Sequence, residues 1–135
     1  MRVGNVFYGL FREFSSGKPH FLFVIGIPTG DMPYIVLTAI TSQIEKARRR
    51  LQINALSPET LVELSPSDYP ALCLPSVVDC NYPVKCPQDL FEMDFGDFNR
   101  KEDLPKHLVE RIISGVLRSP LVSNEIKKII MNCEL

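Results

Sequence analysis

Two apolar runs joined by a turn-forming segment constrain the fold of this chain most. Residues 21–27 read Phe-Leu-Phe-Val-Ile-Gly-Ile, and residues 34–40 read Tyr-Ile-Val-Leu-Thr-Ala-Ile. Runs of this length that contain almost no polar residue are typical of strands covered on both faces. The segment between them, residues 28–33, contains Gly30 and two prolines, which favour a tight connection. We therefore expect an antiparallel hairpin at the centre of the fold.

Further strand-like segments flank this hairpin. They are residues 6–11, 60–64, 76–80 and 90–95. In the last segment Phe91, Met93 and Phe95 alternate with other residues, which is the pattern of a half-exposed strand. The sequence therefore predicts a mainly β fold with some α, a small barrel or strongly bent sheet of about six strands.

A short helix is expected after the third strand. Ser42 and Glu45 have the spacing of a capping box, in which each side chain bonds an amide of the other's turn. Apolar residues recur at helical spacing over residues 43–51. We therefore predict a helix there, inserted between the two groups of strands.

The end of the chain is predicted to be helical. Asp103 is expected to cap a helix with a clean apolar stripe, and Ser123 to cap a second, shorter helix. The chain is then one domain, residues 1–135, with a barrel body over residues 1–98 and a helical tail over residues 99–135 packed on it.

The composition is that of an ordinary globular domain, with 45% hydrophobic and 23% charged residues. No apolar run approaches the roughly 20 residues that a membrane helix needs, and no signal peptide is recognisable at the N-terminus. We therefore expect a cytoplasmic protein without membrane contact.

The four cysteines are not arranged as metal ligands. Cys73, Cys80, Cys86 and Cys133 form no C-x-x-C pair, and both histidines lie far from them in sequence. A structural zinc site normally needs closer ligand pairs. We expect buried or half-buried free thiols, with no metal and no cofactor.

Two groups of polar residues are expected to meet at one end of the central hairpin. Lys18 and His20 precede the second strand, and Thr41 and Ser42 follow the third. Because both positions lie far from the connecting turn, antiparallel pairing makes them neighbours. Histidine titrates near neutral pH, and a lysine beside it can hold a phosphate. An ordinary loop lysine, a partly packed histidine and a plain helix cap are the alternative explanations.

A basic cluster and one acidic residue complete the candidates for RNA contact. The net charge of −1 gives no global attraction to nucleic acid, so any contact has to come from a local patch. Arg48, Arg49 and Arg50 could neutralise phosphates beside the helix, and Asp79 is the remaining polar candidate. A solvated helix face and a turn-capping carboxylate are the alternatives.

RNA can be cleaved without a metal when its 2′-hydroxyl is the nucleophile. A base has to take the hydroxyl proton, a cation has to stabilise the phosphate, and an acid has to protonate the leaving oxygen. His20, with Lys18 or one of the arginines, could supply these groups. Taken singly, these residue types fit the ordinary alternatives better, and it is their convergence at one end of the hairpin that raises the case for metal-free cleavage of single-stranded RNA.

The order of these features resembles the PemK/MazF-like toxins of type II toxin–antitoxin systems. The resemblance lies in the loop ending Gly17-Lys18-Pro19-His20, the strand ending Ile40-Thr41-Ser42-Gln43, the segment Ser76-Val77-Val78-Asp79 and the apolar helix at residues 108–117. It covers most of residues 5–117.

This resemblance implies an SH3-like barrel that cleaves RNA as a homodimer and is neutralised by a small protein antitoxin. Lys18 and Thr41 are the closest matches to the family's basic residue and threonine, and Lys18 stands where the family usually has arginine. Lysine lacks the two-pronged hydrogen bonding of arginine. The alternative prediction is therefore a catalytically silent SH3-like module that binds a protein partner.

Overall fold

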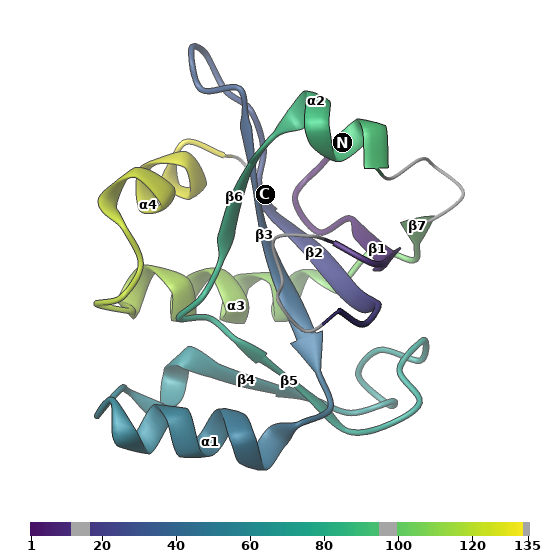
Figure 1. Ribbon diagram of the computed structural model, residues 1–135, viewed down its shortest axis with the longest axis vertical. Coiled ribbons are helices and arrows are strands. Elements are labelled where there is room, and N and C mark those ends of the chain that lie inside the picture. Colours follow the sequence, from purple (N-terminus) through teal and green to yellow (C-terminus); the bar gives the residue numbers. More distant parts are fainter. Residues whose placement is uncertain (12–16, 95–99, 134–135) are drawn as a thin grey trace.

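The computed structural model describes residues 1–11, 17–94 and 100–133 (Figure 1). The strands are β1 (Val6–Gly9), β2 (His20–Gly26), β3 (Tyr34–Thr41), β4 (Leu61–Leu64), β5 (Ser76–Asp79), β6 (Val84–Pro87) and β7 (Arg100–Lys101). The helices are α1 (Ile44–Ile53), the 3-10 turn η1 (Pro58–Thr60), α2 (Gln88–Asp94), α3 (Lys106–Arg118) and α4 (Asn124–Met131). The prediction of a mainly β fold with some α is confirmed.

The described strands form one antiparallel sheet of seven strands. Its order is β4-β5-β3-β2-β1-β7, and β6 pairs with β3 beside this path. In the described part of the chain, no pairing joins the outer strands β4 and β7, so the sheet is open there. The predicted strands at residues 6–11, 60–64 and 76–80 correspond to β1, β4 and β5.

The central hairpin has the predicted form. β2 and β3 pair antiparallel, with Phe21 opposite Ile40 and Phe23 opposite Thr38, and a bulge interrupts the register between Val24 and Gly26. Alternate residues point to opposite faces of the sheet. Both faces of the pair are buried, as the apolar runs predicted.

Helices α3 and α4 cover one face of the sheet. Both pack against β2 or β3, and α3 also contacts β4 and η1 (Figure 1). Fully or nearly fully buried side chains from the helices and the sheet form this core, among them Leu108, Ile112, Val116, Ile129, Phe23, Ile25, Val36, Ile40, Val62 and Val78. The tail helices were predicted correctly. No helix among the described residues is long and apolar enough to cross a membrane.

Helix α2 covers the other face of the sheet. It occupies a segment for which a strand was predicted, at residues 90–95. Phe91 is fully buried, and its ring meets that of Phe7 edge-on at 5.1 Å between centroids. Met93, by contrast, is 80% exposed. A strand would turn both side chains to the same face, so the predicted strand at 90–95 is wrong. Phe95 itself lies outside the described residues.

The second edge of β3 pairs with two strands that the chain forms in succession. Ile40 lies opposite Val78 of β5, whereas Leu37 lies opposite Val84 of β6. Residues 80–83, between β5 and β6, form a turn that does not pair with β3. Neither β6 nor the two-residue β7 was predicted from the sequence.

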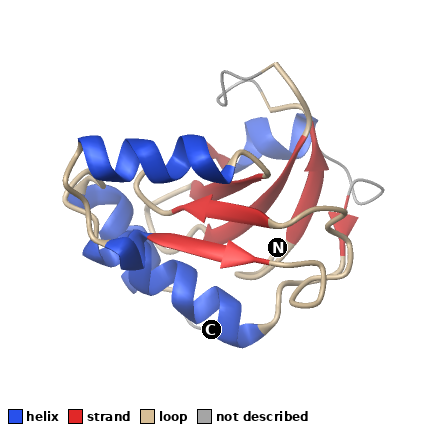
Figure 2. Cartoon of the chain, turned by 90° about the horizontal axis from the view of Figure 1, so that it is seen from below, coloured by secondary structure: helices blue, strands red, loops and turns tan. Residues whose placement is uncertain are grey.

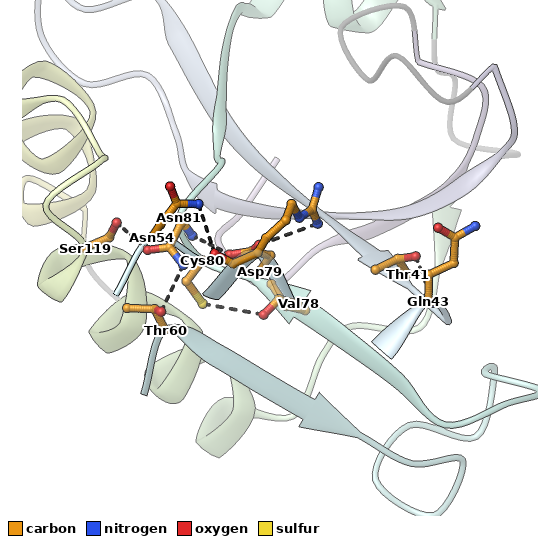
Figure 3. Close-up of polar contacts among 10 residues, drawn as sticks. Thr41, Gln43, Asn54, Thr60, Val78, Asp79, Cys80, Asn81 and Ser119 are labelled. Carbon is orange, nitrogen blue, oxygen red and sulfur yellow. Dashed lines mark hydrogen bonds and ion pairs between the residues drawn. The ribbon is translucent and has the colours of Figure 1, made fainter. Parts of the chain in front are cut away.

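A buried hydrogen-bond network holds this turn in place (Figure 3). Asn81 is 3% exposed, and its Nδ2 donates to Thr60 Oγ1 at 2.9 Å and to Asp79 Oδ1 at 2.8 Å. Ser119 Oγ donates to Asn81 Oδ1 at 2.6 Å. One amide thus ties η1 and the end of α3 to the sheet and satisfies its own buried polar atoms.

Two of the three predicted helix caps are wrong. Ser42 does not cap α1, because the helix follows Gln43 and has no side-chain cap. Thr41 Oγ1 accepts from the Gln43 amide at 3.1 Å. Asp103 instead accepts from Asn5 Nδ2 at 2.9 Å and so fastens the N-terminal segment. Ser123 does cap α4, since its Oγ accepts from the Ile126 amide at 3.2 Å.

The close approach of α3 to the Asn81 turn yields a test of the packing. A Cβ at Gly115 would lie 2.8 Å from Cys80 Sγ and 2.9 Å from the Glu59 carbonyl oxygen. Overpacking of this kind costs about 1–3 kcal/mol and exceeds the gain in helix propensity of roughly 1 kcal/mol. We expect Gly115→Ala to lower the free energy of unfolding in urea by roughly 1 kcal/mol. Ser114→Ala on the exposed face is the control, and a Gly115→Ala protein as stable as wild type would contradict the packing.

Candidate functional site

A groove lies where β2 begins and β3 ends. Its volume is about 460 Å³, within the range of small-molecule and nucleotide sites. The lining residues are Tyr8, Lys18, Pro19, His20, Phe21, Ile40, Thr41, Ser42, Gln43, Ala71, Leu72, Cys73, Leu74 and Ser76. The four residues predicted to meet at this end of the hairpin, Lys18, His20, Thr41 and Ser42, therefore line a single groove.

His20 is held at the start of β2 by the neighbouring strand β3. Its Nδ1 lies 3.3 Å from the carbonyl oxygen of Ile40 and its side chain is half-buried. Because a carbonyl oxygen only accepts hydrogen bonds, Nδ1 carries the hydrogen in this contact. In the neutral ring Nε2 then has the lone pair, which makes it the atom that can take a proton.

Thr41 turns the chain from β3 toward α1 and keeps a hydroxyl at the groove. Its Oγ1 accepts from the amide of Gln43, but a hydroxyl also has a hydrogen to donate. Ser42 is exposed beside it, at the mouth of the groove. Two hydroxyls and the Lys18 ammonium thus offer hydrogen-bond donors to an anionic ligand.

The opposite wall comes from the segment between β4 and β5. Cys73 and Leu74 are exposed there, between the buried Leu72 and the start of β5. Tyr69 anchors the segment, because its ring is buried and its hydroxyl donates to the Glu102 carbonyl oxygen at 2.6 Å. Burial raises the pKa of the Tyr69 hydroxyl to about 12, so it keeps this hydrogen at neutral pH.

Sequence reasoning missed Tyr8, Cys73 and Leu74. Tyr8 could have been found, because the predicted meander places β1 beside β2 and Tyr8 opposite the start of that strand. Cys73 and Leu74 carried no such signal, since the path of residues 65–75 follows from tertiary anchoring by Tyr69.

The three arginines predicted to contact RNA do not line the described part of the groove. Arg48 forms ion pairs with Glu45, at 2.8 Å, and with Glu63, and these raise the pKa of its guanidinium, Glu63 most strongly. Arg50 lies 3.6 Å from Asp79 and over the ring of Tyr82. Arg49 is exposed on the same helix, and the described groove lining includes none of the three.

Asp79 belongs to the Asn81 turn rather than to the groove. Its side chain is 10% exposed, and Oδ1 accepts from both the amide and the side chain of Asn81. Figure 3 shows Asp79 in this cluster, with Thr41 and Gln43 lying apart from it. This agrees with the turn-capping alternative, and an RNA contact at Asp79 remains a prediction without support from the groove.

The cysteines differ in exposure. Cys80 and Cys86 are buried and Cys133 is half-buried, as expected, but Cys73 is exposed, against the prediction. Within residues 1–11, 17–94 and 100–133, no three His, Cys, Asp or Glu side chains gather in a way that could hold a metal ion.

Comparison of this chain with protein-family models and with curated proteins gave no match.

The exposure of Cys73 can be checked by thiol titration. A thiolate is the reactive species, and burial raises the pKa of Cys80 to about 12, so that thiol is protected both sterically and chemically. We expect one thiol of the native protein to react rapidly with an aromatic disulfide reagent. This fast phase should disappear in Cys73→Ser and persist in Cys86→Ser. A fast phase that survives Cys73→Ser would show that the groove wall is built differently.

Proposed function

We propose that this chain is a toxin-like endoribonuclease that cleaves single-stranded RNA at the groove between the start of β2 and the end of β3. The observation that carries the proposal is the shared groove of His20, Lys18, Thr41 and Ser42. A base with its Nδ1 fixed by a backbone carbonyl stands there beside a cation and two hydroxyls. These are the groups that metal-free phosphodiester cleavage requires.

The reaction follows from the placement of these groups. His20 Nε2 takes the proton of the 2′-hydroxyl, and the 2′-oxygen attacks the adjacent phosphorus. Lys18 and the hydroxyls of Thr41 and Ser42 stabilise the charge on the phosphate oxygens. The bond from phosphorus to the 5′-oxygen breaks, and the leaving oxygen is protonated by the His20 imidazolium formed in the first step or by the Lys18 ammonium. The products are a 2′,3′-cyclic phosphate and a 5′-hydroxyl.

The wider reading rests on the resemblance to PemK/MazF-like toxins. Under this proposal the bent sheet is an SH3-like barrel, the working form in the cytoplasm is a homodimer, and a small protein antitoxin neutralises it. The antiparallel meander β1–β2–β3, with Lys18 just before β2 and Thr41 at the end of β3, supports the reading. No cofactor or metal takes part in the proposed reaction.

A protein-binding module is the second candidate. It is favoured by the apolar side chains that line the same groove, since Tyr8 is 41% and Leu74 is 59% exposed. Exposed apolar surface in a groove is typical of peptide recognition. Such a module would bind its partner unchanged after loss of the His20 imidazole.

Cleavage of single-stranded RNA in the presence of EDTA tests the enzyme directly. Removal of a general base lowers rates by about 10²–10⁴-fold, so we expect His20→Ala to lose at least about a hundredfold in kcat. Lys18→Arg should retain cleavage, because guanidinium holds phosphate at least as well as ammonium. The matched control is His107→Ala, because His107 is the second histidine of the chain and lies on α3, outside the described groove lining. Absence of cleavage by wild type at any pH would refute the enzyme and leave the binding module.

Protection of Cys73 tests where the RNA lies. A 2′-O-methyl oligoribonucleotide cannot be cleaved, because its 2′-oxygen has no proton to give up. Bound in the groove, it should slow the reaction of Cys73 with an alkylating reagent in proportion to its occupancy. An unchanged Cys73 rate at saturating oligonucleotide would place RNA binding at another surface.

A further inference from the structure

Tyr8 is the most exposed aromatic side chain of the groove and has a fixed position. It follows Phe7, which is 5% exposed, on β1, whereas 41% of Tyr8 is exposed. The exposed part of the Tyr8 ring contributes nothing to the hydrophobic core. Its surface is therefore available to a ligand that approaches Lys18 and His20.

The ring of Tyr8 is supported from beneath by two further aromatic rings. Tyr8 lies opposite Phe21 in the β1–β2 ladder, with ring centroids 4.8 Å apart. Phe21 in turn meets Tyr69 edge-on at 6.2 Å, and Tyr69 is anchored through its hydroxyl to Glu102. Packing of this kind limits the orientations of the Tyr8 ring before any ligand binds. A pre-oriented ring loses little conformational entropy when it stacks.

The groove combines this ring with donors for an anion. Lys18 and the hydroxyls of Thr41 and Ser42 line the same groove as Tyr8. A nucleotide carries a flat base next to a phosphate, so it can use both the Tyr8 ring and the donors. Single-stranded RNA is commonly recognised by stacking of splayed bases on aromatic side chains. The phosphate oxygens of a nucleotide accept hydrogen bonds from these donors, whereas an apolar peptide side chain offers only a surface for the ring.

We infer that Tyr8 is the base-stacking residue of the groove, and that it holds the base of a nucleotide next to the phosphate bound by Lys18. This inference deepens the proposed function and rests on it. Tyr8 makes no contact with the reacting atoms in this arrangement. It positions the bound RNA and selects for an unpaired, flat base. Double-stranded RNA is therefore excluded from productive binding.

Binding of an uncleavable oligonucleotide tests the inference apart from catalysis. The probe is a fluorescein-labelled 2′-O-methyl hexaribonucleotide of mixed sequence, and the readout is anisotropy. Loss of one stacked base weakens binding by about tenfold, so we expect Tyr8→Leu to raise the Kd by this factor. Tyr8→Phe, which keeps the ring, should bind within about twofold of wild type. Tyr82→Leu, at a residue that is 43% exposed beside α1, is the matched control.

The salt dependence separates stacking from phosphate contact. Tyr8→Leu removes no cation, so the slope of log Kd against log salt should be unchanged, whereas Lys18→Gln should reduce it by about 0.7. In cleavage assays Tyr8→Leu should raise KM more than it lowers kcat. Folding of each variant is checked by thermal unfolding.

The outcomes distinguish this inference from the proposed function. Wild-type affinity in Tyr8→Leu, an equal loss in Tyr8→Phe, or binding of a proline-rich peptide in place of the oligonucleotide would overturn the stacking role. RNA cleavage that does not depend on Tyr8 would refute the inference and leave the nuclease. Tyr8-dependent binding without any cleavage would support the inference and refute the nuclease.

Discussion

The pairing of β2 with β3 is the constraint on which the rest of the structure depends. Both faces of this pair are covered, one by α3 and α4 and the other by α2 and Phe7. Figure 2 shows helices on both sides of the strands. A strand pair buried on both faces has no room for polar chemistry along its length. Functional groups can stand only at its two ends. One end is the turn at residues 28–33, and the other carries Lys18, His20 and Thr41.

The position of the groove's far wall depends on a second constraint, the interruption between β5 and β6. The Asn81 amide holds the interruption by bonds to η1, to Asp79 and to the end of α3. β5 can therefore pair with the last residues of β3 and place Ser76 and the preceding segment beside Thr41. The polar residues of the turn thus shape the groove without lining it.

Much of the fold was predictable because several segments have one unambiguous period. The apolar runs of β2 and β3 and the stripe of α3 fit one structure each. Residues 90–95 do not, because an apolar residue at every second position over six residues is also compatible with a short amphipathic helix. The contrast between the buried Phe91 and the exposed Met93 decides for the helix. β6 and β7 were missed because they pair along existing edges and have no apolar pattern of their own.

Strand geometry predicted the part of the site that lies on the central hairpin. It did not predict the positions of the arginines. Antiparallel pairing was sufficient to bring Lys18 and His20 to Thr41 and Ser42. It could not place the arginines, whose partners Glu63 and Asp79 come from strands later in the chain. Those ion pairs involve Arg48 and Arg50, and the described groove lining contains Lys18 but none of the three arginines. With one lysine and no arginine in that described lining, charge alone would not hold RNA there under the proposed function, since each phosphate contact contributes only modestly and is weakened by salt. Affinity then has to come from apolar surface, which this groove has at Tyr8 and Leu74.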